Sequence, residues 1–239
     1  MDEMLISLEK KVLASNDEKA LELRKALEAA GVFCANLISS PGSGKTALVT
    51  ALAKMMIAEG YRVAVLVGDC ATDNDARRIA SSGAMVRQIV TEGICHLEAT
   101  MVVDHLSGWD LDEIDLLLIE NVGNLVCPTG FDLGQDIKIA LISTTEGEDK
   151  PLKYPALFSS ADLAVVTKLD LASACEFDEA ALLANFGQVN PEIEISMTSA
   201  KNGTGVSDLM RTLEKRMHER RAGSSQGKDS KKNDRRNSG

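Results

Sequence analysis

The eight residues Ser39-Ser-Pro-Gly-Ser-Gly-Lys-Thr46 decide the fold of this chain. They follow a continuous apolar run at 33–38 and open an amphipathic segment, which is the strand, loop and helix order that a phosphate-binding loop needs. The glycines allow backbone N–H groups to face phosphate oxygens, Lys45 can reach the β- and γ-phosphates, and the Thr46 hydroxyl can ligate Mg²⁺. Ser39 replaces the first glycine of the usual pattern, which matters only if this position needs a positive φ. The predicted phosphate-binding residues are Gly42, Ser43, Gly44, Lys45, Thr46 and Ala47.

Outside this loop, short apolar runs alternate with amphipathic segments, which predicts βα units around a mainly parallel sheet, an α/β fold. Most of the runs are rich in Val, Ile and Leu, as expected for strands covered on both faces. The predicted strands span 33–38, 62–67, 86–89, 116–119, 137–142, 163–166 and 193–197. The predicted helices span 45–58, 72–81, 96–106, 176–185 and 206–220, after two short helices within 1–31.

The composition excludes several classes of protein. The 239 residues include 36 Asp or Glu and 26 Lys or Arg, and 44% of the side chains are hydrophobic, enough for a core without disulfides. Five unevenly spaced Cys and the lack of a signal-like start favour a reducing, cytoplasmic setting. No run approaches the roughly 20 apolar residues of a membrane span. Without such a run we expect no membrane partner, and because the chain is acidic we expect no nucleic-acid partner.

The net charge of −10 is unevenly distributed. Residues 211–239 hold ten Lys or Arg against four Asp or Glu, so residues 1–210 carry a net charge of −16. The last 18 residues have no large apolar side chain, and we expect 222–239 to be a disordered basic tail. The tail is either solvated, which we favour, or an arm for an acidic partner. Residues 1–221 then form one domain, with 1–31 as its helical extension.

A second nucleotide signal lies near the end of the chain. The segment Val165-Val-Thr-Lys-Leu-Asp170 is similar to the [NT]KxD guanine-recognition pattern. The Asp170 carboxylate can accept from guanine N1–H and from its 2-amino group, while the Lys168 stem lies on the base. Thr167 replaces the commoner Asn, which weakens one supporting hydrogen bond. Ala200, in Thr198-Ser-Ala-Lys201, can present its N–H to guanine O6, so the order of these motifs predicts GTP binding.

Carboxylates follow two predicted strands that face the phosphate loop. Asp69, Asp75 and Glu120 are the candidate Mg²⁺ ligands together with Thr46, because Mg²⁺ prefers hard oxygen ligands. One aspartate can instead orient the attacking water, so Lys45, Asp69 and Asp75 are the candidate catalytic residues. Asp75 is alternatively only a charge at a helix start. The N–H of Gly123 can hold a mobile loop against a γ-phosphate.

Thiol and imidazole groups form the third candidate site. Cys95 and His96 are adjacent, and Cys127 lies seven residues after Glu120. Such ligands select soft or borderline transition metals. On spacing alone, however, a Cys-His pair is more often packing than a site. Three ligands leave a tetrahedral shell open, which a second chain's Cys95 can close across a two-fold axis. The remaining cysteines, Cys34, Cys70 and Cys175, are interpreted as packing thiols.

Several segments together resemble the HypB family, GTPases that support nickel insertion into [NiFe]-hydrogenase. They are SSPGSGKT (39–46), GDCATDNDARR (68–78), GICHLEA (93–99), IENVGNLVCPTGFDLGQ (119–135), TEGEDKPLKYP (145–155) and VTKLDL (166–171). The resemblance covers about 1–220 and implies a three-layer P-loop NTPase fold, slow GTP hydrolysis and GTP-promoted homodimers. It also implies a Ni²⁺ or Zn²⁺ site at the dimer interface, held by Cys95, His96 and Cys127. An accessory protein of nickel insertion and the hydrogenase large-subunit precursor are the implied partners, and Lys153 is expected at the nucleotide or the interface.

The departures from the family and the alternatives limit what the resemblance implies. Residues 1–30 contain neither Cys nor His, so a nickel-storage role has no support. The related urease GTPase UreG shares the nucleotide motifs but carries a Cys-Pro-His metal motif. A P-loop kinase and a plain metal carrier that keeps the loop only as scaffold are the other hypotheses. The favoured mechanism couples GTP-ordered switch regions to a shared metal site, which hydrolysis releases.

Overall fold

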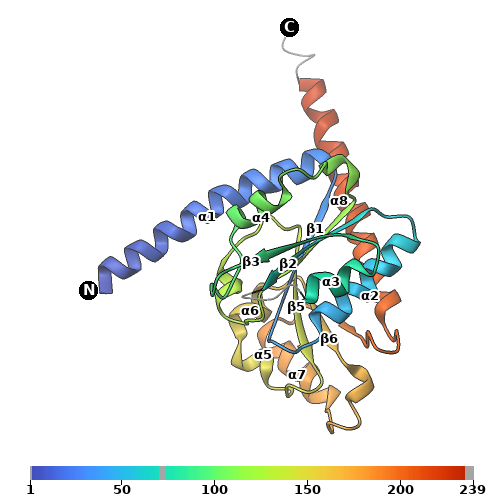
Figure 1. Ribbon diagram of the computed structural model, residues 1–239. Coiled ribbons are helices and arrows are strands. Elements are labelled where there is room, and N and C mark those ends of the chain that lie inside the picture. Colours follow the sequence, from blue (N-terminus) through green and yellow to red (C-terminus); the bar gives the residue numbers. More distant parts are fainter. Residues whose placement is uncertain (1, 70–73, 235–239) are drawn as a thin grey trace.

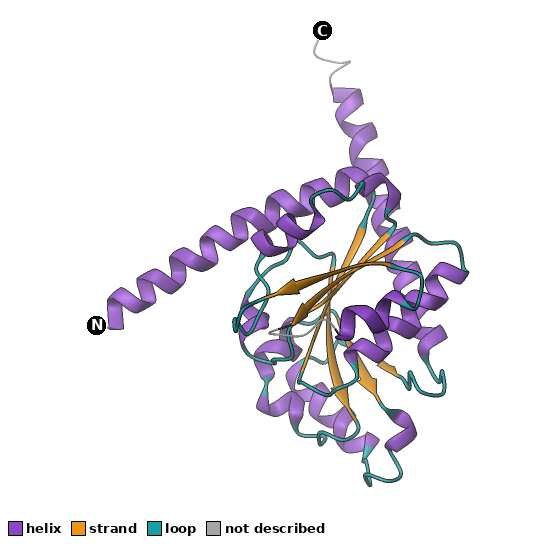
Figure 2. Cartoon of the chain, in the orientation of Figure 1, coloured by secondary structure: helices purple, strands orange, loops and turns teal. Residues whose placement is uncertain are grey.

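A seven-stranded parallel sheet forms the centre of the molecule. The computed structural model describes residues 2–69 and 74–234. The strand order is β3-β2-β4-β1-β5-β6-β7, and every neighbouring pair is parallel. Figures 1 and 2 show the twisted sheet inside a shell of helices. The seven predicted strands are confirmed. Their bounds are β1 Phe33–Ser39, β2 Val63–Asp69, β3 Met85–Val90, β4 Leu116–Glu120, β5 Ile137–Ser143, β6 Leu163–Thr167 and β7 Glu194–Met197.

Helices cover both faces of the sheet and make the predicted three-layer α/β fold. Successive strand residues point to opposite faces, so each buried strand contributes to two cores. One core packs α2, α3 and α8 on the sheet, and the other face is covered by α1 and α4 at one end and by α6 and α7 at the other. The helices are α1 Asp2–Ala30, α2 Lys45–Ala58, α3 Asn74–Ala80, α4 Ala99–Leu106, α5 Lys150–Lys153, α6 Pro155–Ser160, α7 Glu179–Val189 and α8 Val206–Asp234.

The prediction of two short N-terminal helices is wrong, because α1 is one continuous helix. The polar triplet at 15–17 does not interrupt it, since the Asn16 side chain makes its hydrogen bonds to other elements. Asn16 Oδ1 accepts from the backbone N–H of Ala99 at 2.8 Å, and Asn16 Nδ2 donates to the Asp132 carbonyl at 2.8 Å. Asn16 thus accepts a hydrogen bond from the first backbone N–H of α4. The N-terminal part of α1 extends away from the sheet (Figure 1).

The C-terminal helix is longer than predicted. The sequence predicts a helix end at 220 and a disordered tail over 222–239, whereas the α8 backbone is helical through Asp234. The packed part is anchored where Arg220 Nε donates to Asp136 Oδ1 at 2.9 Å. Beyond it, the Lys, Arg, Ser and Gln residues of the sequence are compatible with a helical backbone. Residues 235–239 lie outside the described residues, and the domain boundary at 221 stays a prediction.

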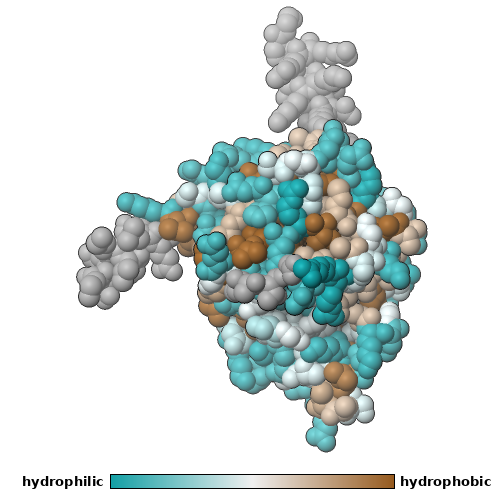
Figure 3. Space-filling view, in the orientation of Figure 1, coloured by the Kyte–Doolittle hydropathy of each residue, from teal (hydrophilic) through white to brown (hydrophobic). Residues whose placement is uncertain are grey.

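The surface of the molecule is mainly polar. Hydrophilic side chains dominate the face in Figure 3, where apolar residues are scattered among them. Among the helices in the described part of the chain, none has both the length and the apolar character that crossing a bilayer requires.

Candidate functional site

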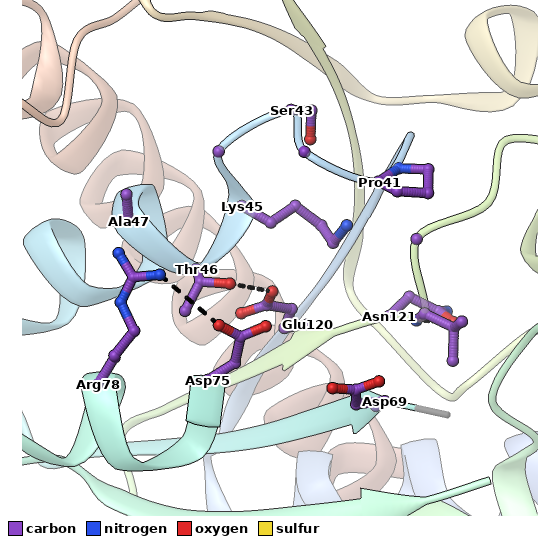
Figure 4. A pocket seen from close by; sticks show the side chains of 15 residues that line it. Pro41, Ser43, Lys45, Thr46, Ala47, Asp69, Asp75, Arg78, Glu120 and Asn121 are labelled. Atoms are coloured by element: carbon purple, nitrogen blue, oxygen red, sulfur yellow. Dashed lines mark hydrogen bonds and ion pairs between the residues drawn. The ribbon is translucent and has the colours of Figure 1, made fainter. Parts of the chain in front are cut away.

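The loop between β1 and α2 forms one wall of a pocket of about 490 Å³ (Figure 4). Gly42 and Gly44 have φ values of 73° and 93°, in the left-handed region that side chains disfavour, and Gly44 is the N-cap of α2. The exposed N–H groups of a helix start favour bound anions. The pocket lining includes all of the predicted phosphate-binding residues: Gly42, Ser43, Gly44, Lys45, Thr46 and Ala47.

Ser39 occupies the position of the first glycine in the usual phosphate-loop pattern, and its conformation does not require a glycine. It is the last residue of β1, is fully buried and is absent from the positive-φ residues of the described chain. Its hydroxyl oxygen lies 2.7 Å from Lys45 Nζ, which donates to it. The ammonium group is therefore held over the loop. Burial lowers the pKa of Lys45, against the opposing effect of the Glu120 carboxylate.

Thr46 and Glu120 bring the start of α2 and the end of β4 together. The Thr46 hydroxyl donates to Glu120 Oε1 at 2.8 Å. Burial raises the pKa of Glu120 from 4.5 to about 7, opposed by Lys45 and by the bond from Thr46. The second oxygen, Oε2, is buried without a hydrogen-bond partner in the described part of the chain. An orphaned acceptor beside a phosphate loop fits a hard divalent cation.

Asp69 and Asp75 line the same pocket from the end of β2 and the first turn of α3 (Figure 4). The charges of both aspartates raise the pKa of Glu120, although burial is the larger cause. The three carboxylates therefore lie close enough to interact electrostatically. Arg78 Nη1 lies 3.8 Å from Asp75 Oδ1. Arg78 and Asn121 also line the pocket and are not among the predicted site residues. The position of Arg78 one helical turn after Asp75 is the signal in the sequence that could have indicated it.

Gly123 lies against the phosphate loop, as its predicted role requires. A Cβ at this position would lie 3.0 Å from the Pro41 Cα, so the loop after β4 packs closely on the phosphate loop and a side chain here would push the two loops apart. Both residues line the phosphate pocket. Residues 70–73, which include Cys70, fall outside the described residues.

A second pocket of about 260 Å³ adjoins the first, since Gly44 and Ala47 line both. Asp170 lies in it, in the short 3₁₀ turn Leu169–Leu171 that follows β6, and Ser199 Oγ donates to its Oδ1 at 2.6 Å. That bond, with the Lys201 ammonium 3.7 Å from Oδ2, lowers the pKa of Asp170. The carboxylate is thus ionised and acceptor-only. The lining includes Thr167, Lys168, Asp170 and Ala200, four of the predicted base-binding residues.

Thr167 joins the two pockets. Its hydroxyl donates to the Ser43 carbonyl of the phosphate loop, so threonine at this position does support the loop. Lys168 follows with φ 57°, a left-handed conformation in which the Thr144 hydroxyl donates to its carbonyl at 2.8 Å. Lys153 is exposed, pairs with Asp149 and is not among the lining residues of either pocket.

Cys95 and His96 lie in the loop between β3 and α4. Cys95 Sγ is 3.8 Å from His96 Nδ1, and the imidazole stacks on Phe131 at a centroid distance of 3.8 Å. His96 Nε2 is buried, 3.7 Å from Glu98 Oε1 and without a hydrogen bond in the described chain. Burial lowers the pKa of His96, which favours the neutral, metal-binding form of the imidazole.

Cys127 begins the short 3₁₀ turn Cys127–Gly130 after β4, with its N–H 3.3 Å from Asn124 Oδ1. Within residues 2–69 and 74–234 the structure has no cluster of three or more His, Cys, Asp or Glu side chains arranged to hold a metal ion. Cys95, His96 and Cys127 therefore do not form a complete site in one described chain, and their joint role stays a prediction.

The fold and these pockets define a P-loop nucleotide-binding protein. Residues 33–197 match the family model described as CobW/HypB/UreG, nucleotide-binding domain. The hydrogenase maturation factor HypB of Azotobacter vinelandii is 46% identical over 213 residues, which is 88% of this chain and 69% of that protein. The probable HypB of Methanocaldococcus jannaschii is 38% identical, over 90% of this chain and 97% of its own. The chain thus belongs to the CobW/HypB/UreG family, and within it to the HypB group.

Two solved HypB structures support this family assignment. The crystal structure of HypB from Helicobacter pylori in complex with nickel is 36% identical, with a TM-score of 0.81 over 86% of this chain and 96% of that one. HypB from Archaeoglobus fulgidus is 34% identical, with a TM-score of 0.79 over 85% of this chain and 99% of its own. A LAO/AO transport system kinase, 19% identical with a TM-score of 0.53, shares the fold.

Proposed function

We propose that this chain is a GTP-hydrolysing metallochaperone that assists nickel insertion into [NiFe]-hydrogenase. The observation that carries the proposal is the segment after β4. It follows the buried Glu120, the last residue of β4, which lines the phosphate pocket and has one carboxylate oxygen without a hydrogen-bond partner in the described chain, and it reaches the soft ligand Cys127 seven residues after Glu120. One short segment thus connects a nucleotide site with a candidate transition-metal ligand.

The nucleotide is GTP in this proposal. The ionised Asp170 carboxylate accepts from guanine N1–H and from the 2-amino group, a pair of donors that adenine lacks. The Ala200 N–H reaches guanine O6, and the Lys168 stem packs on the base. The adjoining pockets are consistent with a base and its phosphates bound side by side.

Hydrolysis rests on positioning and on charge neutralisation. Lys45 neutralises charge on the β- and γ-phosphates, and Asp69 or Asp75 orients the attacking water while the other helps to hold the cation. Thr46 and Glu120 supply hard oxygens that fit Mg²⁺, which when bound neutralises phosphate charge. The Gly123 N–H then holds the loop after β4 against the γ-phosphate.

Nickel is the cargo. Cys95, His96 and Cys127 offer two thiolates and an imidazole, a donor set that also fits Zn²⁺. The shell closes when two chains pair in the GTP state. Three large apolar side chains near these ligands support an interface: Val90, Ile94 and Val126 are 54%, 40% and 65% exposed. The H. pylori relative was crystallised with nickel.

The partners follow from this role. We propose that a nickel-insertion accessory protein and the hydrogenase large-subunit precursor receive the metal, in a reducing cytoplasmic setting. Urease is a second candidate target, because relatives from Helicobacter hepaticus and H. pylori, 39% and 36% identical, are named hydrogenase/urease maturation factors. A UreG-like metal motif is less favoured, since Thr129 stands where Cys-Pro-His has histidine.

The proposal is tested by nickel affinity and oligomeric state, measured with GDP and with a non-hydrolysable GTP analogue. We expect dimers and a changed nickel affinity with the GTP analogue. Identical affinities and an unchanged oligomeric state contradict the coupling. ATP turnover that survives Asp170→Ala favours a kinase, and nickel transfer unaffected by Lys45→Ala favours a plain carrier.

A further inference from the structure

Leu97, the residue after the Cys95-His96 pair, lies between the two strand ends that carry the candidate Mg²⁺ carboxylates. Its side chain is fully buried and packs on Gly68 in β2. A Cβ built on Gly68 would lie 2.9 Å from three Leu97 side-chain carbons, closer than such atoms approach one another. Leu97 therefore depends directly on where this end of β2 lies.

The backbone of Leu97 is attached to the neighbouring strand. Its N–H donates to Asn121 Oδ1 at 3.2 Å, and the same oxygen accepts from the Val122 N–H at 2.9 Å. Asn121 is 1% exposed, and its Nδ2 donates to Asn36 Oδ1 in β1 at 3.2 Å. The amide is thus oriented by β1, by the segment after β4 and by the Leu97 loop at once.

Both contacts lie one residue from a carboxylate of the phosphate pocket. Gly68 precedes Asp69, and Asn121 follows Glu120 (Figure 4). On the other side, only His96 separates Leu97 from Cys95. The path from the pocket to the Cys-His pair is therefore a single buried residue. It is separate from the covalent path that leads from Glu120 to Cys127.

We propose that Leu97 is a positioning residue that transmits the nucleotide state from the ends of β2 and β4 to Cys95 and His96. The inference rests on the proposed function, since it assumes that GTP and the metal are coupled. Interiors are close-packed, so a shift of either strand end displaces Leu97 instead of being absorbed by empty space. Its displacement turns the adjacent imidazole and thiol, and so changes the geometry offered to nickel.

The test measures the ratio of nickel affinities with a non-hydrolysable GTP analogue and with GDP, using chelator competition and the nickel–thiolate absorbance. Gly68→Ala pushes Leu97 away, and Asn121→Ala removes the acceptor of its N–H. The matched control is Gly187→Ala in α7, where an added Cβ meets nothing within 4 Å and φ is not positive. We expect the ratio to fall toward one by about fivefold in both variants and to stay unchanged in the control.

Rescue distinguishes positioning from structural damage. Gly68→Ala combined with Leu97→Val removes one methylene from the clash, and we expect the ratio to recover. Damage to the fold would lower nickel affinity equally with both nucleotides and leave the ratio intact. If Gly68→Ala does not fold, Asn121→Ala decides.

The two proposals fail in different arms. A wild-type ratio of one contradicts the proposed function, and this inference with it. A wild-type ratio far from one that persists in Gly68→Ala and Asn121→Ala overturns the role of Leu97 and leaves the proposed function standing.

Discussion

The Thr46 hydroxyl donates a hydrogen bond to Glu120 Oε1 over 2.8 Å, which joins the first turn of α2 to the carboxyl end of β4. The contact holds two hard oxygen donors from distant parts of the sequence beside one phosphate loop. Because the carboxyl ends of parallel strands lie along one edge of the sheet, Asp69 from β2 reaches the same pocket. The polar side chains of the pocket thus lie at the carboxyl ends of β1, β4 and β2, which are neighbours in the sheet with β4 in the middle.

Glu120→Gln tests the cation role of that carboxylate. The change keeps the shape of the side chain and removes the charge, so we expect Mg²⁺-dependent GTP hydrolysis to fall by about 10²-fold or more. Stability should be unchanged or higher, because the variant no longer buries an acid group. Phosphate release at several Mg²⁺ concentrations and urea unfolding measure the two effects. Glu113→Gln, at an exposed position, is the control; full activity in Glu120→Gln would exclude this carboxylate as a ligand.

Asp170→Asn tests the base specificity. An amide donates where the carboxylate accepts, so the variant loses the bond to the guanine 2-amino group and gains one to the 2-oxo group of xanthine. We expect GTP affinity to fall by about 10²-fold and XTP affinity to rise. Competition binding with GTP, XTP and ATP measures both. Asp208→Asn, whose side chain pairs with Arg211 on α8, is the matched control. Unaltered preference for GTP would place the base elsewhere.

Asp115, which directly precedes β4, forms an ion pair with Arg62 that we expect to weaken in acid. Hydrogen bonds from Arg62, with a further one from Arg221, lower its pKa from 3.8 to about 2, despite partial burial. The unfolded chain binds the proton at a higher pH than the folded chain. The stabilisation is therefore present above pH 3.8 and is lost as pH falls toward 2.

Unfolding of Asp115→Asn and of wild type between about pH 7 and about pH 3 checks this ion pair. We expect the variant to be less stable near neutral pH by about 1 kcal/mol, since Arg62 is half exposed, and the difference to shrink in acid. A gap that is constant with pH would show that the carboxylate charge contributes nothing.

The strands of the sheet and the phosphate loop could be predicted because each rests on a local sequence pattern. The residues predicted to bind guanine follow strand ends and line one pocket, while their role stays a prediction. The continuity of α1 could not be predicted, since Asn16 resembles a helix start until its partners Ala99 and Asp132 are known. Leu97 likewise carries no sign of its role: it is an ordinary apolar residue whose contacts with Gly68 and Asn121 exist only in the folded chain.

Cys127→Ala tests whether the segment after β4 contributes a metal ligand. The side chain lines neither pocket, so we expect GTP affinity to stay within about twofold of wild type, while loss of a thiolate lowers nickel affinity by about tenfold or more. Nickel–thiolate absorbance and chelator competition, each with GTP analogue bound, measure the metal, and fluorescent-nucleotide binding measures GTP. Cys175→Ala removes an exposed thiol and serves as the control.

Because Cys127 and Cys95 lie on different loops, Cys95→Ala should weaken nickel binding to a similar extent, and the double variant should lose little more if both thiolates belong to one site. Full nickel affinity in Cys127→Ala would remove this residue from the site and leave the Cys95-His96 pair to be completed from elsewhere.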